Sequence, residues 1–183
     1  MSIKNLLRMG HPILRMEAQE LKLEEILSSE TQDLLNDLID SMKHYGGVGI
    51  AAPQIGVSKK VAILEVLDTN PRYKIEKVYP LTVFINPKIT VLDETPQGFW
   101  EGCLSVPGLR GYVERPRKIR IDFLDEKANK QSIEAEGFVA TVFQHELDYL
   151  CGKLYLDHIK DTKLLSYNEE FEEFIRTKVQ ESV

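Results

Sequence analysis

The chain has 183 residues, of which 43% are apolar, and carries a formal net charge of -6. This size is sufficient to bury a core and lies within the usual range of one domain. A pI near 5.3 argues against binding nucleic acid by charge, because that requires clustered Lys and Arg. With neither repeat nor linker in the sequence, we expect one domain over residues 1–183.

The sequence contains no apolar run long enough for a signal peptide or a membrane span. We therefore expect a cytoplasmic protein without a membrane partner. In a reducing compartment the two cysteines, Cys103 and Cys151, need no disulfide. For Cys151 the sequence favours a small buried apolar residue.

Helical spacing of apolar residues predicts a helix from Ser29 to Tyr45. Ser29 and Gln32 fit a capping box at its start, and Gly46-Gly47 stops it. The helix leads directly into the segment GVGIAAPQIG at residues 47–56.

Strand-like runs follow this segment, at residues 61–66, 81–86, 88–92 and 118–124. Three prolines bracket them as expected boundaries: Pro80, Pro87 and Pro116. A last helix is predicted from Asn168 to Gln180. It would place Phe171, Phe174 and Ile175 on one side and acidic residues on the other.

Residues 138–151, FVATVFQHELDYLC, are apolar almost all round, which indicates a helix buried in a core. Strands grouped between helical segments then predict an α+β fold with mixed or antiparallel sheets packed around this central helix. The helix nevertheless carries Gln144, His145, Glu146 and Asp148. Each unsatisfied buried polar group costs roughly 1–3 kcal/mol, so these side chains need partners, and a metal site would provide them.

His145-Glu146 is the first half of a zinc-hydrolase pattern in which two His four residues apart hold a divalent metal. The Glu is then placed to take a proton from water at the metal. Here Tyr149 occupies the position four residues on. Alone, the pattern more often marks a satisfied pair of core side chains than a metal site.

Two further segments contain residues that could take part in catalysis or binding. In QGFWEGCLSVPG, residues 97–108, Cys103 either presents a thiolate at a tight backbone corner or is a buried thiol at a strand end. In GVGIAAPQIG, small residues permit close approach of a ligand and Gln54 offers an amide donor. The same segment also suits a plain helix stop and turn.

Taken together, GVGIAAPQ, EGCLS and QHELDYLCG resemble, in order and separation, the three signature motifs of peptide deformylases. The resemblance runs from RMGHPILR near the start to GKLYLDHI after the third motif. It implies that Cys103 and His145 are metal ligands and that Glu146 is the general base and later the general acid. Gln54 and the backbone N–H of Leu104 would stabilise the oxyanion.

The same resemblance implies a reaction, hydrolysis of the formyl group from the N-terminal formyl-methionine of nascent polypeptides. One divalent metal would serve, usually Fe²⁺, with Zn²⁺, Ni²⁺ or Co²⁺ as alternatives. Gly49 would contact the substrate backbone. Arg110 is a candidate for gripping the substrate, with a solvated surface position as its alternative.

Tyr149 stands where the resemblance implies a second helical His. Three outcomes follow: Tyr149 ligates the metal, water replaces the missing ligand, or no metal binds. A phenol has a pKa near 10 and must lose its proton to ligate, although a bound cation favours that loss. The alternative function is therefore a catalytically impaired relative that keeps the peptide-binding cleft.

The surroundings of the motifs give three further expectations. Asp148 would orient a ligand or pair with Arg115 or Arg117, or else be a capped core carboxylate. His158, outside the helix, is expected at the surface. The tail from residue 169 to 183, with five Glu against one Arg and one Lys, disfavours docking on ribosomal RNA by charge.

Overall fold

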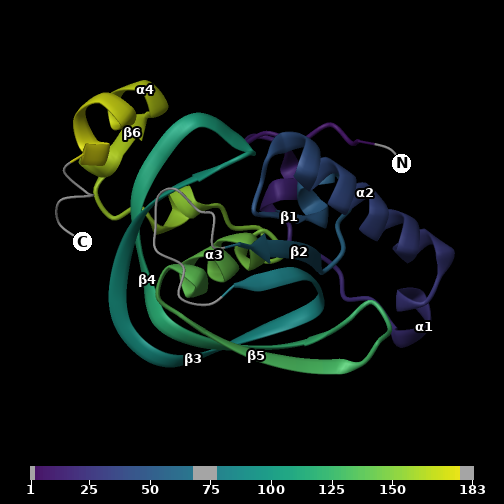
Figure 1. Ribbon diagram of the computed structural model, residues 1–183. Coiled ribbons are helices and arrows are strands. Elements are labelled where there is room, and N and C mark those ends of the chain that lie inside the picture. Colours follow the sequence, from purple (N-terminus) through teal and green to yellow (C-terminus); the bar gives the residue numbers. More distant parts are fainter. Residues whose placement is uncertain (1–2, 68–77, 178–183) are drawn as a thin grey trace.

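An antiparallel sheet curves around one buried helix, α3 (Gly137–Asp148), in the computed structural model, which describes residues 3–67 and 78–177 (Figure 1). The order β1-β2-β3-β4-β5 follows the sequence, and β6 pairs with β4. The strands are β1 Gly49–Ala51, β2 Val61–Val66, β3 Tyr79–Cys103, β4 Val106–Leu124, β5 Lys130–Glu136 and β6 Leu165–Tyr167. The expected α+β class is confirmed, with one antiparallel sheet.

Strands β3 and β4 form a long ribbon. Pro80 is the second residue of β3 and so lies at a strand boundary, as predicted. Pro87 is inside β3 and Pro116 is inside β4, so for these two the prediction was wrong. Irregular pairing accommodates them: the register shifts between Ile85 and Lys88, and β5 begins to pair only at Lys118. A proline lacks a backbone donor, and it is tolerated where the hydrogen-bond ladder is interrupted or one side is open.

Helix α2 spans Ser29–Tyr45 as predicted and follows the short α1 (Leu23–Ile26). Its cap is one residue earlier than expected, since Ser28 accepts a hydrogen bond from the Thr31 N–H at 3.3 Å. The predicted partner Gln32 instead donates to the Ile26 carbonyl. Gly46 ends the helix with φ of 66°, a left-handed conformation that suits glycine. The helix therefore delivers the chain directly to β1.

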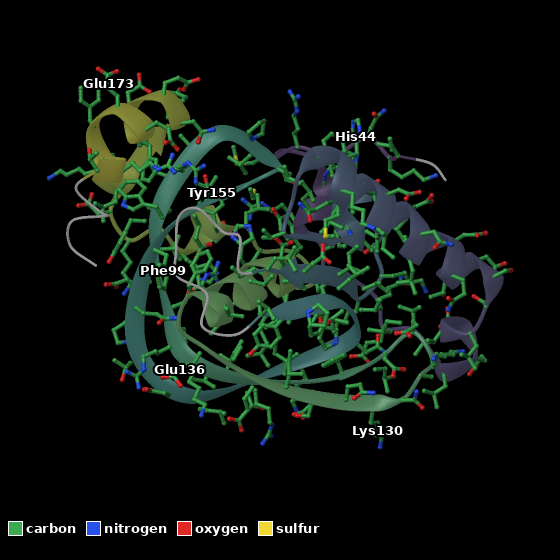
Figure 2. All side chains as sticks on the ribbon, in the orientation of Figure 1. His44, Phe99, Lys130, Glu136, Tyr155 and Glu173 are labelled. Atoms are coloured by element: carbon green, nitrogen blue, oxygen red, sulfur yellow. The ribbon has the colours of Figure 1, made fainter. Side chains whose placement is uncertain are left out.

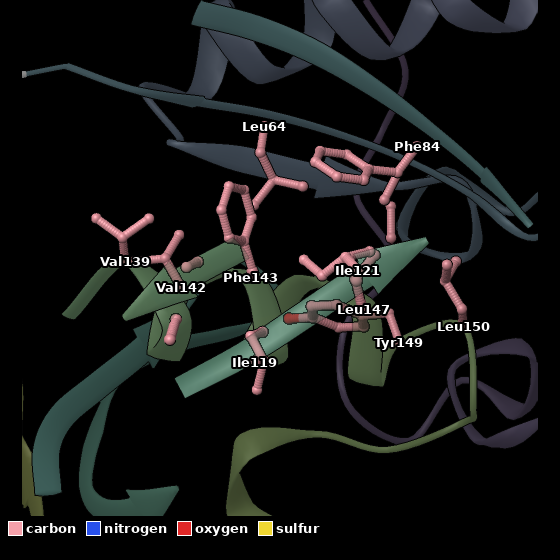
Figure 3. Packing of buried hydrophobic residues seen from close by; sticks show 14 of the residues in the cluster. Leu64, Phe84, Ile119, Ile121, Val139, Val142, Phe143, Leu147, Tyr149 and Leu150 are labelled. Carbon is pink, nitrogen blue, oxygen red and sulfur yellow. The ribbon is translucent and has the colours of Figure 1, made fainter. Parts of the chain in front are cut away.

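Helix α3 lies in the centre of the larger apolar cluster, as its sequence predicts (Figure 3). The helix ends at Asp148 rather than continuing to residue 151, and Tyr149 still has helical dihedral angles. Gly152, with φ of 68°, then turns the chain away. Cys151, just before this turn, is exposed, so its predicted burial was wrong.

The C-terminal helix begins at Asn168 as predicted and is wider over part of its length. It consists of α4 (Asn168–Glu170), a π-helical turn at Phe171–Ile175 and further helical residues to 177, and residues 178–180 of the expected helix lie outside the described residues. Phe171 is buried whereas Phe174 is 56% exposed, so the two do not share a buried side. The wider π turn changes the angular spacing on which that prediction rested. No helix in the described part of the chain is long and apolar enough to cross a membrane.

Candidate active site

A pocket of about 1000 Å³ opens between β1, α3 and the end of the β3–β4 ribbon. All three sequence motifs contribute to its walls. The lining includes seven of the predicted site residues: Gly49, Gln54, Cys103, Leu104, Arg110, His145 and Glu146. Tyr149 is absent from the residues that line it. The fold thus brings segments separated by about a hundred positions in the sequence to one cavity.

Gln54 links the first motif to the second. It lies in a 3-10 turn, Ala52–Ile55, that follows β1, and only 2% of its surface is exposed. Its Oε1 accepts a hydrogen bond from the Ala51 N–H at 2.8 Å, and its Nε2 donates to Ser105 Oγ at 3.2 Å. These two bonds fix the orientation of the amide, which leaves its second Nε2 proton for a ligand.

Glu146 lies directly against the backbone of β1. A Cβ atom added to Gly49 would stand 2.7 Å from Glu146 Cγ and 2.8 Å from Cδ, so only glycine fits there. The Glu146 Oε2 atom is buried without a hydrogen-bond partner. Burial raises the pKa of Glu146 to about 7, with the Glu101 charge adding to the rise and His145 and Arg115 opposing it. A carboxyl with that pKa suits proton transfer near neutral pH.

His145 is held by a carboxylate behind it. Its Nδ1 lies 2.7 Å from Glu101 Oε2, an arrangement that presents Nε2 on the other side of the ring. Burial favours the neutral imidazole, but hydrogen bonds to Cys103 and Glu101 outweigh it and raise the pKa of His145 to about 10. Since a metal binds neutral imidazole, metal binding at this ring would release a proton.

Glu101 belongs to a buried network that the sequence did not reveal. Arg115 donates to Glu101 from Nε at 2.6 Å and from Nη2 at 3.0 Å, and from Nη1 to Asp148 at 2.8 Å. Of the two predicted partners of Asp148, Arg115 is therefore the one found, while Arg117 pairs with Asp93 and Glu136. His158, expected at the surface, is partly exposed and also contacts this network, because its Nε2 lies 2.8 Å from Asp148 Oδ2.

The sequence offered one signal for Glu101, its position two residues before Cys103 on a strand. Alternate residues of a strand face the same side. The register of β3 against β4 shifts between Glu101 and Cys103, however, so simple alternation does not establish that they share a face. The role of Glu101 emerges only from the packing of α3 against the ribbon.

Tyr149 is 1% exposed and packs among the core side chains (Figure 3), with its ring centroid 5.9 Å from that of His145. Its hydroxyl is buried without a well-formed hydrogen bond. Burial, followed by the neighbouring Cys103 and Glu146, raises the pKa of Tyr149 well above its ordinary value. The phenolic oxygen thus lies near the thiol but outside the pocket lining.

The side chains of the pocket include donor atoms for a metal ion. Among residues 3–67 and 78–177, no three His, Cys, Asp or Glu side chains gather in a cation-binding group. Cys103 and His145 supply a thiol and an imidazole side by side, a pair suited to zinc and other transition metals. The Tyr149 hydroxyl, buried beside Cys103 and Ser105 without a well-formed hydrogen bond, is a third oxygen donor for a cation. These side chains fit a transition-metal ion.

A carboxylate poised to exchange protons, an amide donor and a thiol–imidazole pair in one pocket are the components of a metal-assisted hydrolase. The sequence model of the polypeptide deformylase family matches residues 3–164. The chain belongs to this family, whose members are hydrolases that remove the formyl group from new polypeptides and generally use a divalent metal ion.

Individual relatives give the same result. A peptide deformylase of Leptospira biflexa is 45% identical over 172 residues, which cover 94% of this chain and 96% of the relative. Peptide deformylase 1 of Bordetella pertussis is 42% identical, covering 91% and 93%. Among crystal structures, a Met-Ala-Ser-bound class I type b peptide deformylase from Acinetobacter baumannii matches with a TM-score of 0.81 and 33% identity, covering 86% of this chain and 99% of that one. The peptide deformylase of Ehrlichia chaffeensis has a TM-score of 0.77 and 30% identity, with 99% and 97% covered.

Proposed function

We propose that this chain hydrolyses the formyl amide of N-terminal formyl-methionine with a metal ion held by Cys103, His145 and Tyr149. The observation that carries the proposal is the shared pocket of Gln54, Cys103, His145 and Glu146. Family membership supplies the reaction. The assignment of each role to a residue of this chain is our own inference from the pocket.

In this proposal a bound divalent ion supplies Lewis acidity, which makes water a stronger acid and polarises the formyl carbonyl. Glu146 accepts the proton from the attacking water and returns it to the leaving amine. The Gln54 amide and the Leu104 N–H donate hydrogen bonds to the oxygen as its negative charge develops. Glu101 keeps His145 oriented through its 2.7 Å contact with Nδ1.

The proposed substrates are formylated nascent polypeptides, which places the reaction in the cytoplasm, where they emerge. The Acinetobacter baumannii relative was solved with Met-Ala-Ser, and we propose that this chain releases products of the same kind. Gly49 would meet the peptide backbone at the edge of β1. Arg110, half-buried in the pocket wall, would contact residues that follow the methionine.

The role of Tyr149 is the part of the proposal particular to this chain. Its hydroxyl, buried beside Cys103 without a well-formed hydrogen bond, supports ligation over replacement by water. Losing the phenolic proton against a raised pKa costs part of the binding energy of the metal. We therefore propose weaker metal binding than an imidazole at this position would give. Fe²⁺ is the proposed ion, with Zn²⁺, Ni²⁺ and Co²⁺ as substitutes.

The test is a Co²⁺ titration of metal-free protein, followed by the thiolate charge-transfer absorbance and by formate release from formyl-Met-Ala-Ser. Tyr149→Phe should abolish tight binding, and Tyr149→His should strengthen it. Tyr155→Phe is the matched control, because that buried ring also packs against His145, at the same centroid distance of 5.9 Å, but its hydroxyl donates to the Leu109 carbonyl. Unchanged Co²⁺ binding in Tyr149→Phe would exclude Tyr149 as a ligand and leave the third position to water. Formate release by Tyr149→His alone would identify the natural chain as a non-catalytic peptide-binding relative.

A further inference from the structure

The described C-terminal segment, residues 165–177, lies beyond residues 3–164, the part of the chain that the family's sequence model matches. It nevertheless joins the active-site wall. Strand β6 pairs with β4 at Leu109–Gly111, with Ser166 opposite Arg110. The next residue after the strand, Asn168, lines the same pocket as Cys103 and His145. A segment outside the match to the family's sequence model thus contributes to the cavity that holds the proposed catalytic residues.

Phe171 anchors this segment. It is 4% exposed, and its ring centroid lies 5.1 Å from that of Trp100. The guanidinium carbon of Arg110 lies 5.2 Å from the centre of the same ring. Trp100 and Arg110 both line the pocket. The acidic side of the segment faces outward, as Glu173 shows (Figure 2), so the buried contact is aromatic and cationic.

The other side of Arg110 is confined as well. A Cβ placed on Gly102 would lie 3.5 Å from Arg110 Cγ and 3.6 Å from Nη1, so the side chain runs across the glycine next to Cys103. Arg110 is therefore held between the Phe171 ring and the backbone of β3. A planar guanidinium stacked on a ring loses little further freedom when it binds carbonyl or carboxylate oxygens.

We propose that the segment Leu165–Ile175 is a specificity wall of the substrate pocket. Phe171 is a positioning residue for Arg110 and Trp100, and Asn168 contacts peptide residues that follow the methionine. This inference rests on the proposed deformylase function. It predicts selection for peptides with two or more residues after formyl-methionine, because the wall adds contacts to the peptide and none to the formyl group.

The experiment compares KM and kcat for formyl-Met-Ala-Ser and formyl-Met-Ala. Phe171→Ala should raise KM for the longer peptide by about tenfold, with kcat within twofold of wild type and a smaller change in KM for the shorter peptide. Phe174→Ala, on the same turn but 56% exposed, is the matched control and should change neither constant. Equal KM values for Phe171→Ala and wild type would overturn the inference.

Conservative variants separate positioning from simple packing. Phe171→Tyr keeps a ring under Arg110 and should restore KM, whereas Phe171→Leu keeps apolar bulk only and should not. Wild-type KM in Phe171→Leu would overturn the role of the ring. If Phe171→Ala does not fold, Asn168→Ala tests the direct contact, and an unchanged KM for formyl-Met-Ala-Ser would overturn it.

Failure of the proposed function gives a different result. In that case wild-type protein releases formate from neither peptide. The wall is then tested by binding alone, since Trp100 is the only tryptophan in the chain and lies against Phe171. Binding of Met-Ala-Ser should change the fluorescence of Trp100, and a titration gives the Kd of the peptide. Asn168→Ala should raise this Kd, and Phe174→Ala should leave it unchanged. Absence of a fluorescence change in wild type would overturn the wall as well.

Discussion

The Nδ1 atom of His145 lies 2.7 Å from Oε2 of Glu101, and the same carboxylate receives two hydrogen bonds from Arg115. One buried carboxylate thus orients the imidazole and neutralises a guanidinium that is 3% exposed. This relationship ties the geometry of the pocket to the stability of the core, because removal of one partner leaves the other charge buried.

Glu101→Gln should lower the free energy of unfolding by about 3–5 kcal/mol, since Arg115 then keeps only Asp148 as a charged partner. Urea denaturation measures the change. Glu114→Gln, which breaks the exposed pair with Lys160 on the same ribbon, should remain within about 0.5 kcal/mol of wild type. Similar losses in the two variants would contradict the burial of the Glu101 network.

Gly49→Ala should lower kcat by about 100-fold, because the added methyl group displaces the Glu146 carboxylate. The strain should also cost about 1–3 kcal/mol of stability. A double-mutant cycle with Glu146→Ala checks the cause: once the longer side chain is gone, Gly49→Ala should lose most of its effect on stability. If Gly49→Ala destabilised the Glu146→Ala protein as much as the wild type, the added methyl group would clash with a residue other than Glu146.

The two cysteines should react with a thiol reagent in two phases, because Cys151 is exposed and Cys103 is half-buried in the pocket. Cys151→Ser should remove the fast phase. Co²⁺ added to this variant should slow the remaining phase, since a ligating thiolate is no longer available to the reagent. A Cys103 phase with the same rate at saturating Co²⁺ would exclude this sulfur as a ligand.

The β4–β5 turn should become less stable in acid. Asp125 is partly desolvated, but hydrogen bonds from Gln131, Asn129 and Lys127 prevail and lower its pKa to about 2. Because the pKa of Asp125 is lower in the folded state, the ionised carboxylate stabilises the fold above pH 3.8, the pKa of the unfolded state. This stabilisation is lost as the pH falls through about 2, the pKa of the folded state. Asp125→Asn should cost about 1 kcal/mol at pH 7 after discounting for solvent screening. Denaturation at pH 5 and pH 2 should show this difference shrinking, and a constant difference would contradict the ionised role.

The sequence correctly predicted those features of the fold that depend on the spacing of neighbouring residues. Helix α2 and strand β2 have the predicted bounds, because apolar periodicity and a glycine stop are local signals. The motifs that carry Gln54, Cys103 and His145 were also visible, and the fold brings them to one pocket. Their chemical roles remain predictions.

Long-range packing set the features that the sequence did not reveal. Pro87 and Pro116 lie inside strands because irregular pairing of the ribbon accommodates them. The position of Cys151 depends on a turn at Gly152, and that of His158 on the approach of Asp148. Each depends on contacts between distant parts of the chain, about which neighbouring residues carry little information.

The pocket draws its walls from residues as far apart as Asn5 and Asn168, so it exists only when the chain is folded from one end to the other. Any molecule that occupies it binds the native state and not the unfolded state. By mass action, a ligand at 100 times its Kd would then add about 2.7 kcal/mol to the stability of the whole fold. Occupancy should therefore protect even remote strands against thermal denaturation and proteolysis.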